Sequence, residues 1–463
     1  METKTKNDVT STTQSAHEAF ETPLWFHENK IIEADFCRWF LQEHPMHCLN
    51  GMFYTPDGFT EDAAIRRMIY EHIRDLGLTG LSRRVEQLTQ ALKLEAYVEH
   101  LPVYTDRIPV LNGTLYLDGT FSSEKAICLN RLRATYDAKA SLPVNWLHFL
   151  DDLLDHEDQI TLQEYMGYCL IPCTKAQQMM FLIGNGGEGK SRIGLILKKM
   201  FGDSCNMSSL HKIEMNKFAR ADLENKLLMV DDDLRMSALP STNYIKTIVT
   251  AEEATDIERK GHQSVQRLLY SRLLCLGNGS PSALYDKSRG FYRRQIILTT
   301  KDKPEDRVDD PYLIEKLTAE LDGIFLWCFS GLQQLVKNRF RFTISERARE
   351  NLREAEETGN NIRVFMTATE YISLGPGKST TTLRLYQGYQ MWCRDNADKP
   401  VSMRSFAGFL KQNATSYGIK ADNNILNPDG KRVRGFHGIR VDVSLAAFDG
   451  FVPCNGPTPF DEP

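Results

Sequence analysis

The stretch FLIGNGGEGKSRIGLILKKM, residues Phe181–Met200, has a glycine-rich loop between an apolar run and an amphipathic segment. Gly184, Gly189, Lys190 and Ser191 fill the fixed positions of the pattern G-x-x-x-x-G-K-[ST]. The run MMFLI before the loop has the composition of a buried strand. After the loop, apolar residues recur at helical spacing at Ile193, Ile196, Leu197 and Met200. We therefore expect a strand, a loop and a helix in succession.

A strand followed by a glycine loop and a helix directs backbone N–H groups and a helix N-terminus at phosphate groups. Glycine is needed because side chains would block that approach; the alternative is a flexible turn. We expect Lys190 to bind the β- and γ-phosphates of ATP and Ser191 to ligate Mg²⁺. The predicted cofactor-binding residues are Gly184, Asn185, Gly186, Gly187, Glu188, Gly189, Lys190 and Ser191.

Three aspartates follow the apolar run Leu227–Val230 in KLLMVDDDLR. The carboxyl end of a strand is where an α/β sheet places its site. One aspartate could hold Mg²⁺, directly or through water, and a neighbour could polarise the attacking water. Strand alternation predicts that Asp231 and Asp233 point to one side and Asp232 to the other. The sequence leaves open which is metal ligand and which is base, and also allows a solvated acidic turn.

Two further motifs complete the predicted catalytic set. Asn278 ends the apolar run of SRLLCLGNGSP, where its amide could sense the γ-phosphate or position the water, although asparagine before glycine is also a common turn. Arg293 and Arg294 precede another apolar run, and one of them could reach a neighbouring subunit's γ-phosphate as an arginine finger. The alternative is a pair of surface arginines.

The order of these motifs, within Gly184–Arg294, resembles the superfamily 3 helicases, a branch of the AAA+ motors. It is most similar to the poxvirus and satellite-phage primase-helicase type. The resemblance extends over about residues 100–445 and includes LNGTLYLDGTF before the loop and EKLTAELDGIFLWCFSGLQQL after it. It implies a mixed α/β fold with a P-loop AAA+-like motor, ATP and Mg²⁺ as cofactors, and a hexameric ring.

The resemblance also implies a hairpin that touches single-stranded DNA in the channel of the ring. The corresponding segment is TIVTAEEATDIERKGHQSVQR, in which Arg259, Lys260 and His262 surround a turn at Gly261. From the residues alone, this is a basic turn. Two departures are visible: the family usually has an acidic residue, often glutamate, at the aspartate trio, and AEEATD replaces a glycine-aspartate step before the hairpin.

The segment after residue 378 predicts helix, helix and hairpin, an order that resembles a winged helix. Lys431, Arg432 and Arg434 in the hairpin could contact DNA phosphates; the alternative is a protein-docking module. The predicted divisions are a disordered tail (1–21), a helical N-terminal region (22–100), a family-specific pre-motor domain (101–174), the ATPase domain (175–342), a helical connector and hinge (343–378), a winged-helix-like domain (379–445) and a tail (446–463). No primase domain is expected, so a separate primase or polymerase could be a partner.

The bulk composition restricts the remaining possibilities. The formal net charge is −5, so DNA binding must come from local basic patches. The ten cysteines are scattered, which favours a reducing cytoplasm, and no apolar run predicts a membrane span. We expect an ATP-dependent replicative DNA helicase of a phage, plasmid or other mobile element, acting as a hexamer on single-stranded and forked DNA. The alternatives are an origin-melting initiator or helicase loader, and a nucleotide-switched DNA-binding regulator.

Overall fold

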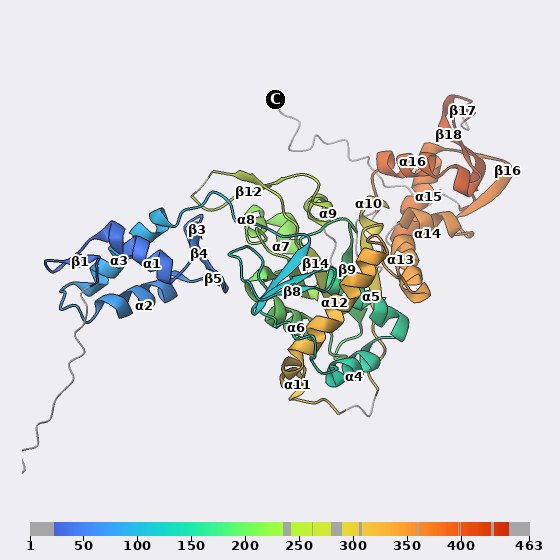
Figure 1. The fold of residues 1–463 in the computed structure, drawn as a ribbon. Helices are drawn as coiled ribbons and strands as arrows, with labels where there is room; N and C mark the ends of the chain where they lie inside the picture. Colours follow the sequence, from blue (N-terminus) through green and yellow to red (C-terminus); the bar gives the residue numbers. More distant parts are fainter. Residues whose placement is uncertain are drawn as a thin grey trace, which may run out of the picture. The chain divides into compact units, whose positions relative to one another are not determined.

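The computed structural model describes residues 23–234, 242–261, 263–278, 289–304, 308–358, 361–396, 398, 400–426 and 430–443 (Figure 1). Both predicted tails, 1–21 and 446–463, and the predicted DNA-binding residue His262 lie outside these residues. The chain divides into two compact units, one of Met1–Val103 with Ser123–Arg131 and one of Tyr104–Ser122 with Leu132–Pro463.

The first unit contains three helices and two small antiparallel sheets. Its elements are β1 (Phe26–His27), β2 (Lys30–Ile31), α1 (Glu33–Glu43), β3 (His47–Leu49), β4 (Met52–Thr55), β5 (Gly58–Thr60), α2 (Asp62–Ile73) and α3 (Leu81–Glu95). The apolar face of α2 is buried at Ile65, Ile69 and Ile73 and packs into the helical core. The region that was expected to be helical therefore contains three helices, and it also contains two small sheets.

The second unit begins with a small sheet that repeats the turns of the first unit. The order β6 (Arg107–Val110), β7 (Gly113–Tyr116) and β8 (Phe121–Ser122) is a three-stranded antiparallel meander like β3-β4-β5. In both meanders, LNGMFYTPDGF and LNGTLYLDGTF, an Asn-Gly step connects the first two strands and an Asp-Gly step connects the last two.

A five-stranded parallel sheet forms the centre of the second unit, with the strand order β10-β11-β14-β9-β15. The strands are β9 (Met179–Gly184), β10 (Cys205–Met207), β11 (Leu228–Leu234), β14 (Arg272–Asn278) and β15 (Gln295–Thr299). Their apolar residues do not alternate with polar ones, because helices cover both faces of a parallel sheet. The chain is therefore a mixed α/β protein, as predicted.

The two faces of this sheet pack differently. On one face, Phe181, Met229 and Cys275 join a buried cluster with α7 (Leu210–Met215) and α9 (Asn243–Thr250). On the other face, α6 (Ser191–Phe201) approaches so closely that a Cβ atom on Gly194 would lie 3.2 Å from Val230 and 3.3 Å from Leu276. This close approach fixes where the helix begins relative to the strand ends.

Two helices from distant parts of the chain lie side by side in this unit (Figure 1). They are α5 (His156–Tyr168), which follows α4 (Val144–Leu153), and α12 (Leu321–Lys337), which follows α11 (Leu313–Ala319). Glycine allows their backbones to touch: a Cβ on Gly167 would lie 2.4 Å from the Cys328 carbonyl oxygen, and one on Gly331 would lie 2.3 Å from the Gln163 carbonyl oxygen. The pair therefore depends on two residues that have no side chain.

The C-terminal part has its own buried cluster, which runs from Ile362 to Val441. Its elements are α14 (Asn361–Thr367), β16 (Ile372–Thr381), α15 (Thr382–Asp395), α16 (Met403–Gln412), β17 (Lys420–Leu426) and β18 (Arg432–Val441), preceded by α13 (Glu346–Thr358). The expected helix, helix and hairpin are present. The expected hinge at ISLGPGKST is instead strand β16, which pairs with β18 around a register shift between Leu374 and Ser379. Glycine and proline here mark an irregular strand and not a linker.

Gly167→Ala is predicted to destabilise the contact between α5 and α12. The added methyl group must displace backbone atoms of α12, which costs about 1–3 kcal/mol for overpacking. Hydrogen exchange measured by mass spectrometry should show faster exchange in both helices. Gly408→Ala is the matched control, because a Cβ at this position in α16 meets nothing within 4 Å. It should stabilise its helix by about 0.5–1 kcal/mol; equal effects of the two variants would contradict the packing explanation.

Candidate functional site

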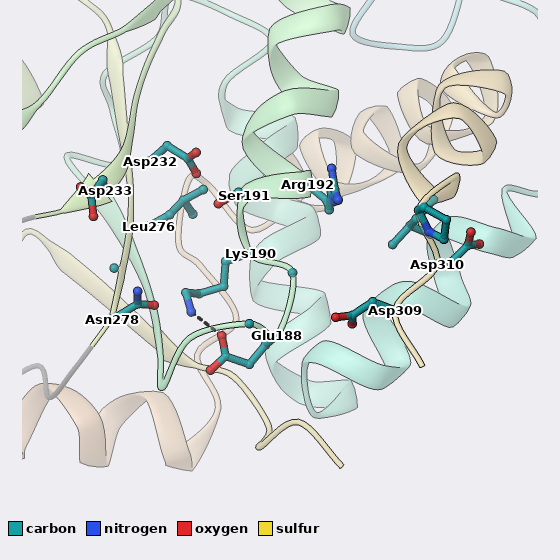
Figure 2. Close-up of a pocket in the computed structure, with 15 residues that line it drawn as sticks. Glu188, Lys190, Ser191, Arg192, Asp232, Asp233, Leu276, Asn278, Asp309 and Asp310 are labelled. Atoms are coloured by element: carbon teal, nitrogen blue, oxygen red, sulfur yellow. Dashed lines mark hydrogen bonds and ion pairs between the residues drawn. The ribbon is translucent and has the colours of Figure 1, made fainter. Parts of the chain in front are cut away.

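A cavity of about 530 Å³ opens where three strands of the central sheet end and α6 begins (Figure 2). Its walls come from the glycine-rich loop, from the ends of β11 and β14, and from the segment before α11. The lining residues are Gly187, Glu188, Gly189, Lys190, Ser191, Arg192, Asp232, Asp233, Leu276, Gly277, Asn278, Asp309, Asp310, Pro311 and Leu313. Residues predicted from three separate motifs thus meet at one cavity.

The loop between β9 and α6 has a backbone that only glycine adopts easily. Gly186, Gly187 and Gly189 have φ values of 107°, 82° and 109°. The preceding glycine, Gly184, leaves room for polar atoms, since a Cβ there would lie 2.2 Å from Thr300 Oγ1 and 2.8 Å from Lys190 Nζ. The glycines of the motif are therefore needed both for the turn and for the space inside it.

Lys190 is buried and paired within the loop. Its Nζ donates to Glu188 Oε2 at 2.6 Å, and the Gly186 N–H donates to Glu188 Oε1 at the same distance. Burial by itself would raise the pKa of the Glu188 carboxyl, but the bonds from Lys190 and from the backbone hold that pKa below its usual value. Glu188 is therefore an ionised side chain at the base of the loop.

The structure separates the three aspartates. Asp231 is buried on the α7 side, where its Oδ2 accepts from the Leu210 N–H at 2.8 Å, and it does not line the cavity. Asp232 and Asp233 are both exposed and both line the cavity. The expected alternation holds for Asp231 and Asp232, which lie on opposite faces of the sheet, but Asp233 lines the cavity with Asp232, where the pairing with β14 shifts register between Asp231 and Leu234. That irregularity turns two consecutive carboxylates toward the same space.

Burial raises the pKa of Asp231, and its bond from Leu210 only partly offsets this effect. A carboxyl whose pKa is raised by folding stabilises the fold while protonated and loses that stabilisation as the pH rises through the folded pKa. At neutral pH the Asp231 charge therefore contributes no stability through its ionisation, and its role is that of a hydrogen-bond acceptor at α7.

Asn278 and Ser191 occupy opposite sides of the loop. The parallel pairing of β14 with β9 places Asn278 opposite Gly184, and its amide lies 3.8 Å from the position of a Cβ on Gly186. Ser191 is the first residue of α6. Asp232 Oδ1 lies 3.9 Å from the Cβ position of Gly194, one turn further along that helix. Asp232 is thus on the Ser191 side of the cavity, as Figure 2 shows.

The cavity also contains charged residues that the sequence motifs did not predict. Asp309 and Asp310 form the wall opposite the aspartates of β11 (Figure 2). Asp309 pairs with Lys303 at 2.8 Å and Asp310 with Lys316 at 2.7 Å. Arg192 lines the cavity from α6. The only local signal in the sequence was an acidic pair before a helix, which is common on surfaces and could not be assigned to a site without the fold.

The donors in the cavity fit a hard cation that shares its ligands with a phosphate. Within the described part of the chain, no three His, Cys, Asp or Glu side chains are grouped closely enough to hold a metal ion by themselves. Mg²⁺ is usually bound by one or two carboxylates together with substrate phosphates and water. Ser191 and Asp232, with Asp233 nearby, could hold it in this way, whereas the predicted ligand Asp231 is turned away.

Arg293 and Arg294 lie at the opposite edge of the sheet. The Met179 N–H donates to the Arg294 carbonyl at 2.8 Å, and Gln295 pairs with Met179, so both arginines lie where β9 and β15 begin. Five residue steps along β9 separate this edge from Gly184, or roughly 17 Å. Burial and the neighbouring Arg293 lower the pKa of Arg294, whose guanidinium also donates to the Gly290 carbonyl. Neither arginine lines the cavity of its own chain.

The predicted hairpin is present as β12 (Thr255–Ile257) and β13 (Val265–Arg267), with Gly261 in the left-handed region at φ 77°. Glu224 anchors it by accepting from Arg259 and, at 3.0 Å, from Arg267. Lys217 pairs with Glu258 at 2.6 Å. Lys260 is exposed at the turn and has no ion pair to any residue that the structure describes. Of the two described cations at the predicted tip, Arg259 is thus occupied by a structural contact.

The cations predicted in the C-terminal hairpin are exposed. Lys431 precedes β18, and Arg432 and Arg434 are two residues apart on this strand, so they share a face. Within the described residues, no helix is both long and apolar enough to cross a bilayer.

The model of DUF5906, described as a family of unknown function, matches residues 182–294, which run from β9 to the arginine pair. No curated protein matches the sequence. Two solved apo structures of the NrS-1 C-terminal region are similar at 11% and 12% identity, with TM-scores of 0.49 and 0.46; each match covers 87% of this chain and 98% of the other. Likeness this weak does not establish a shared fold or activity.

Proposed function

We propose that the chain is a Mg²⁺-dependent ATPase that acts as a DNA helicase in the replication of a phage, plasmid or other mobile element. The observation that carries this proposal is the meeting of Lys190, Asp232 and Asn278 at one cavity. A loop lysine, a strand-end carboxylate and an amide on the adjacent strand are the groups needed to hold phosphates, a metal ion and an attacking water. In the ATPase, Ser191 and Asp232 would hold Mg²⁺, which would neutralise phosphate charge, and Asp233 would polarise the attacking water.

The position of the arginines supports a site that is shared between subunits. Because Arg293 and Arg294 start the strands whose opposite ends form the cavity, neither side chain can reach a phosphate bound in its own chain. An arginine at that edge can contact the nucleotide of an adjacent protomer in a ring. A hexamer is the arrangement implied by the resemblance to superfamily 3 helicases, and in it ATP cleavage moves one subunit against the next.

The hairpin supports the coupling of that motion to DNA. Glu224 accepts from Arg267 at the base of the hairpin and from Arg259 next to its turn, while Lys260 is left exposed at the turn. A cation on a narrow turn can bind one backbone phosphate of a single strand without reading its bases. Arg432 and Arg434 in the C-terminal hairpin provide a second contact to DNA in this proposal.

Lys190→Ala tests the proposal most directly. Loss of the ammonium group removes the contact to the β- and γ-phosphates, so ATP turnover stimulated by single-stranded DNA should fall on the order of a hundredfold. Separation of a forked duplex should be lost with it. Lys199→Ala, on the same helix but outside the cavity lining, should retain both activities. Wild-type turnover without strand separation would favour an origin-melting initiator.

Asp232→Asn and Asp231→Asn should have opposite outcomes. Removing the carboxylate on the Ser191 side should reduce Mg²⁺-dependent turnover on the order of a hundredfold, because a phosphate-bound Mg²⁺ would lose its carboxylate ligand and keep only Ser191. Asparagine at 231 can still accept from the Leu210 N–H and removes a buried charge, so folding and turnover should be retained. Steady-state kinetics over a Mg²⁺ titration compare the two, and a greater loss with Asp231→Asn would reverse the metal assignment.

Lys260→Ala should uncouple turnover from translocation. The cavity is untouched, so basal ATP turnover should stay near the wild-type rate, while forked-duplex unwinding falls roughly fivefold or more as one phosphate contact per subunit is lost. Lys217→Ala is the control, since its ammonium is already paired with Glu258 beside the same hairpin. If Lys260→Ala unwinds DNA at the wild-type rate, the hairpin is not the DNA-gripping element.

A further inference from the structure

A carboxylate occupies the centre of the glycine-rich loop. Both oxygens of Glu188 are engaged, one by the Gly186 N–H and one by Lys190 Nζ, each at 2.6 Å. The Glu188 and Lys190 side chains are 3% and 7% exposed. Backbone N–H groups and a lysine ammonium are the donors that such loops offer to phosphate oxygens. The Glu188 carboxylate therefore makes the contacts that a bound phosphate would make.

The loop has no spare room beneath this pair. A Cβ on Gly184 would lie 2.7 Å from Glu188 Oε1, 2.8 Å from Lys190 Nζ and 2.2 Å from Thr300 Oγ1. Three polar atoms thus crowd against one backbone position, and Glu188 cannot move deeper when a ligand arrives. Glu188 also lines the cavity. When its side chain leaves Lys190, it must therefore move toward the space that the ligand enters.

We propose that Glu188 is an internal competitor of phosphate, which holds Lys190 in the absence of ligand and lowers the affinity of the loop for any phosphate-bearing ligand. The inference rests on the proposed nucleotide-binding function. A phosphate that takes the ammonium must break a charge-assisted hydrogen bond and leave an ionised carboxylate close to its own negative charge. Mg²⁺ offsets part of that repulsion, so affinity depends on both the metal and the displaced glutamate.

This assignment separates Glu188 from the rest of the loop. The other cofactor-binding candidates favour bound nucleotide, and their removal weakens binding. Glu188 opposes binding, and its neutralisation strengthens binding. It acts as an affinity-setting residue: with the carboxylate in place, Lys190 is released only to a ligand that brings enough negative charge and a metal ion.

Glu188→Gln provides the test, with binding measured by isothermal titration calorimetry using Mg·ADP and Mg·pyrophosphate. Glutamine keeps an oxygen that can accept from Gly186 but carries no charge to hold Lys190. The dissociation constants of both probes should fall about tenfold, equivalent to about 1.4 kcal/mol. The gain should be the same for both, because the competition is for phosphate and not for adenosine. Glu188→Ala is the second variant and should also bind both probes more tightly than wild type.

Asp310→Asn is the matched charge control. It removes one negative charge from the wall of the same cavity, but the ion pair of Asp310 is with Lys316, whereas that of Lys190 is with Glu188. Its effect on either dissociation constant should be less than about threefold. If Asp310→Asn tightens binding as much as Glu188→Gln does, the effect comes from the total negative charge of the cavity and not from competition for Lys190. That result would overturn the inference.

The remaining outcomes distinguish the inference from the function on which it rests. Unchanged or weaker binding by both Glu188 variants, with wild type binding normally, overturns the role of Glu188 and leaves the proposed ATPase intact. If wild type and both variants bind neither probe while each remains folded by circular dichroism, the proposed nucleotide site itself is wrong and the inference falls with it.

Discussion

The parallel pairing of β9 with β14 is the constraint on which the candidate site depends. It places Asn278 opposite Gly184, and it brings the carboxyl end of β11 to the same edge through the next pairing in the sheet. Parallel strands carry their carboxyl ends to one side, where backbone groups are left without partners in the ladder. Gly194 then allows α6 to approach the sheet, which sets the helix N-terminus beside those strand ends.

Small irregularities determine how this edge is used. The register shift after Asp231 turns two adjacent carboxylates into the cavity and leaves a third as a hydrogen-bond acceptor for α7. The left-handed glycines fold the loop so that Glu188 reaches Lys190 across only two residues. A regular strand and a regular turn would present different groups. The side chains that line the cavity therefore depend on two departures from ideal geometry, the register shift in β11 and the left-handed glycines of the loop.

The aspartates of the cavity and the predicted arginine pair lie at opposite ends of the central strands. The cavity edge carries Asp232 and Asp233, whereas Arg293 and Arg294 begin the strands at the far edge. Arg192 lines the cavity of its own chain, whereas Arg293 and Arg294 do not. The hairpin held by Glu224 belongs to the same unit as the sheet.

The sequence by itself determined the elements that depend on local pattern. Buried strand runs, the loop glycines and the basic turn around Gly261 follow from periodicity and turn chemistry, which act over a few residues. Only the tertiary structure decided what depends on contacts between distant residues. These are the different fates of Asp231 and Asp232, the pairing of Glu188 with Lys190, the acidic wall at Asp309 and Asp310, and strand β16 in place of a hinge. Register, burial and partner choice are set by packing across the fold, and no local pattern encodes them.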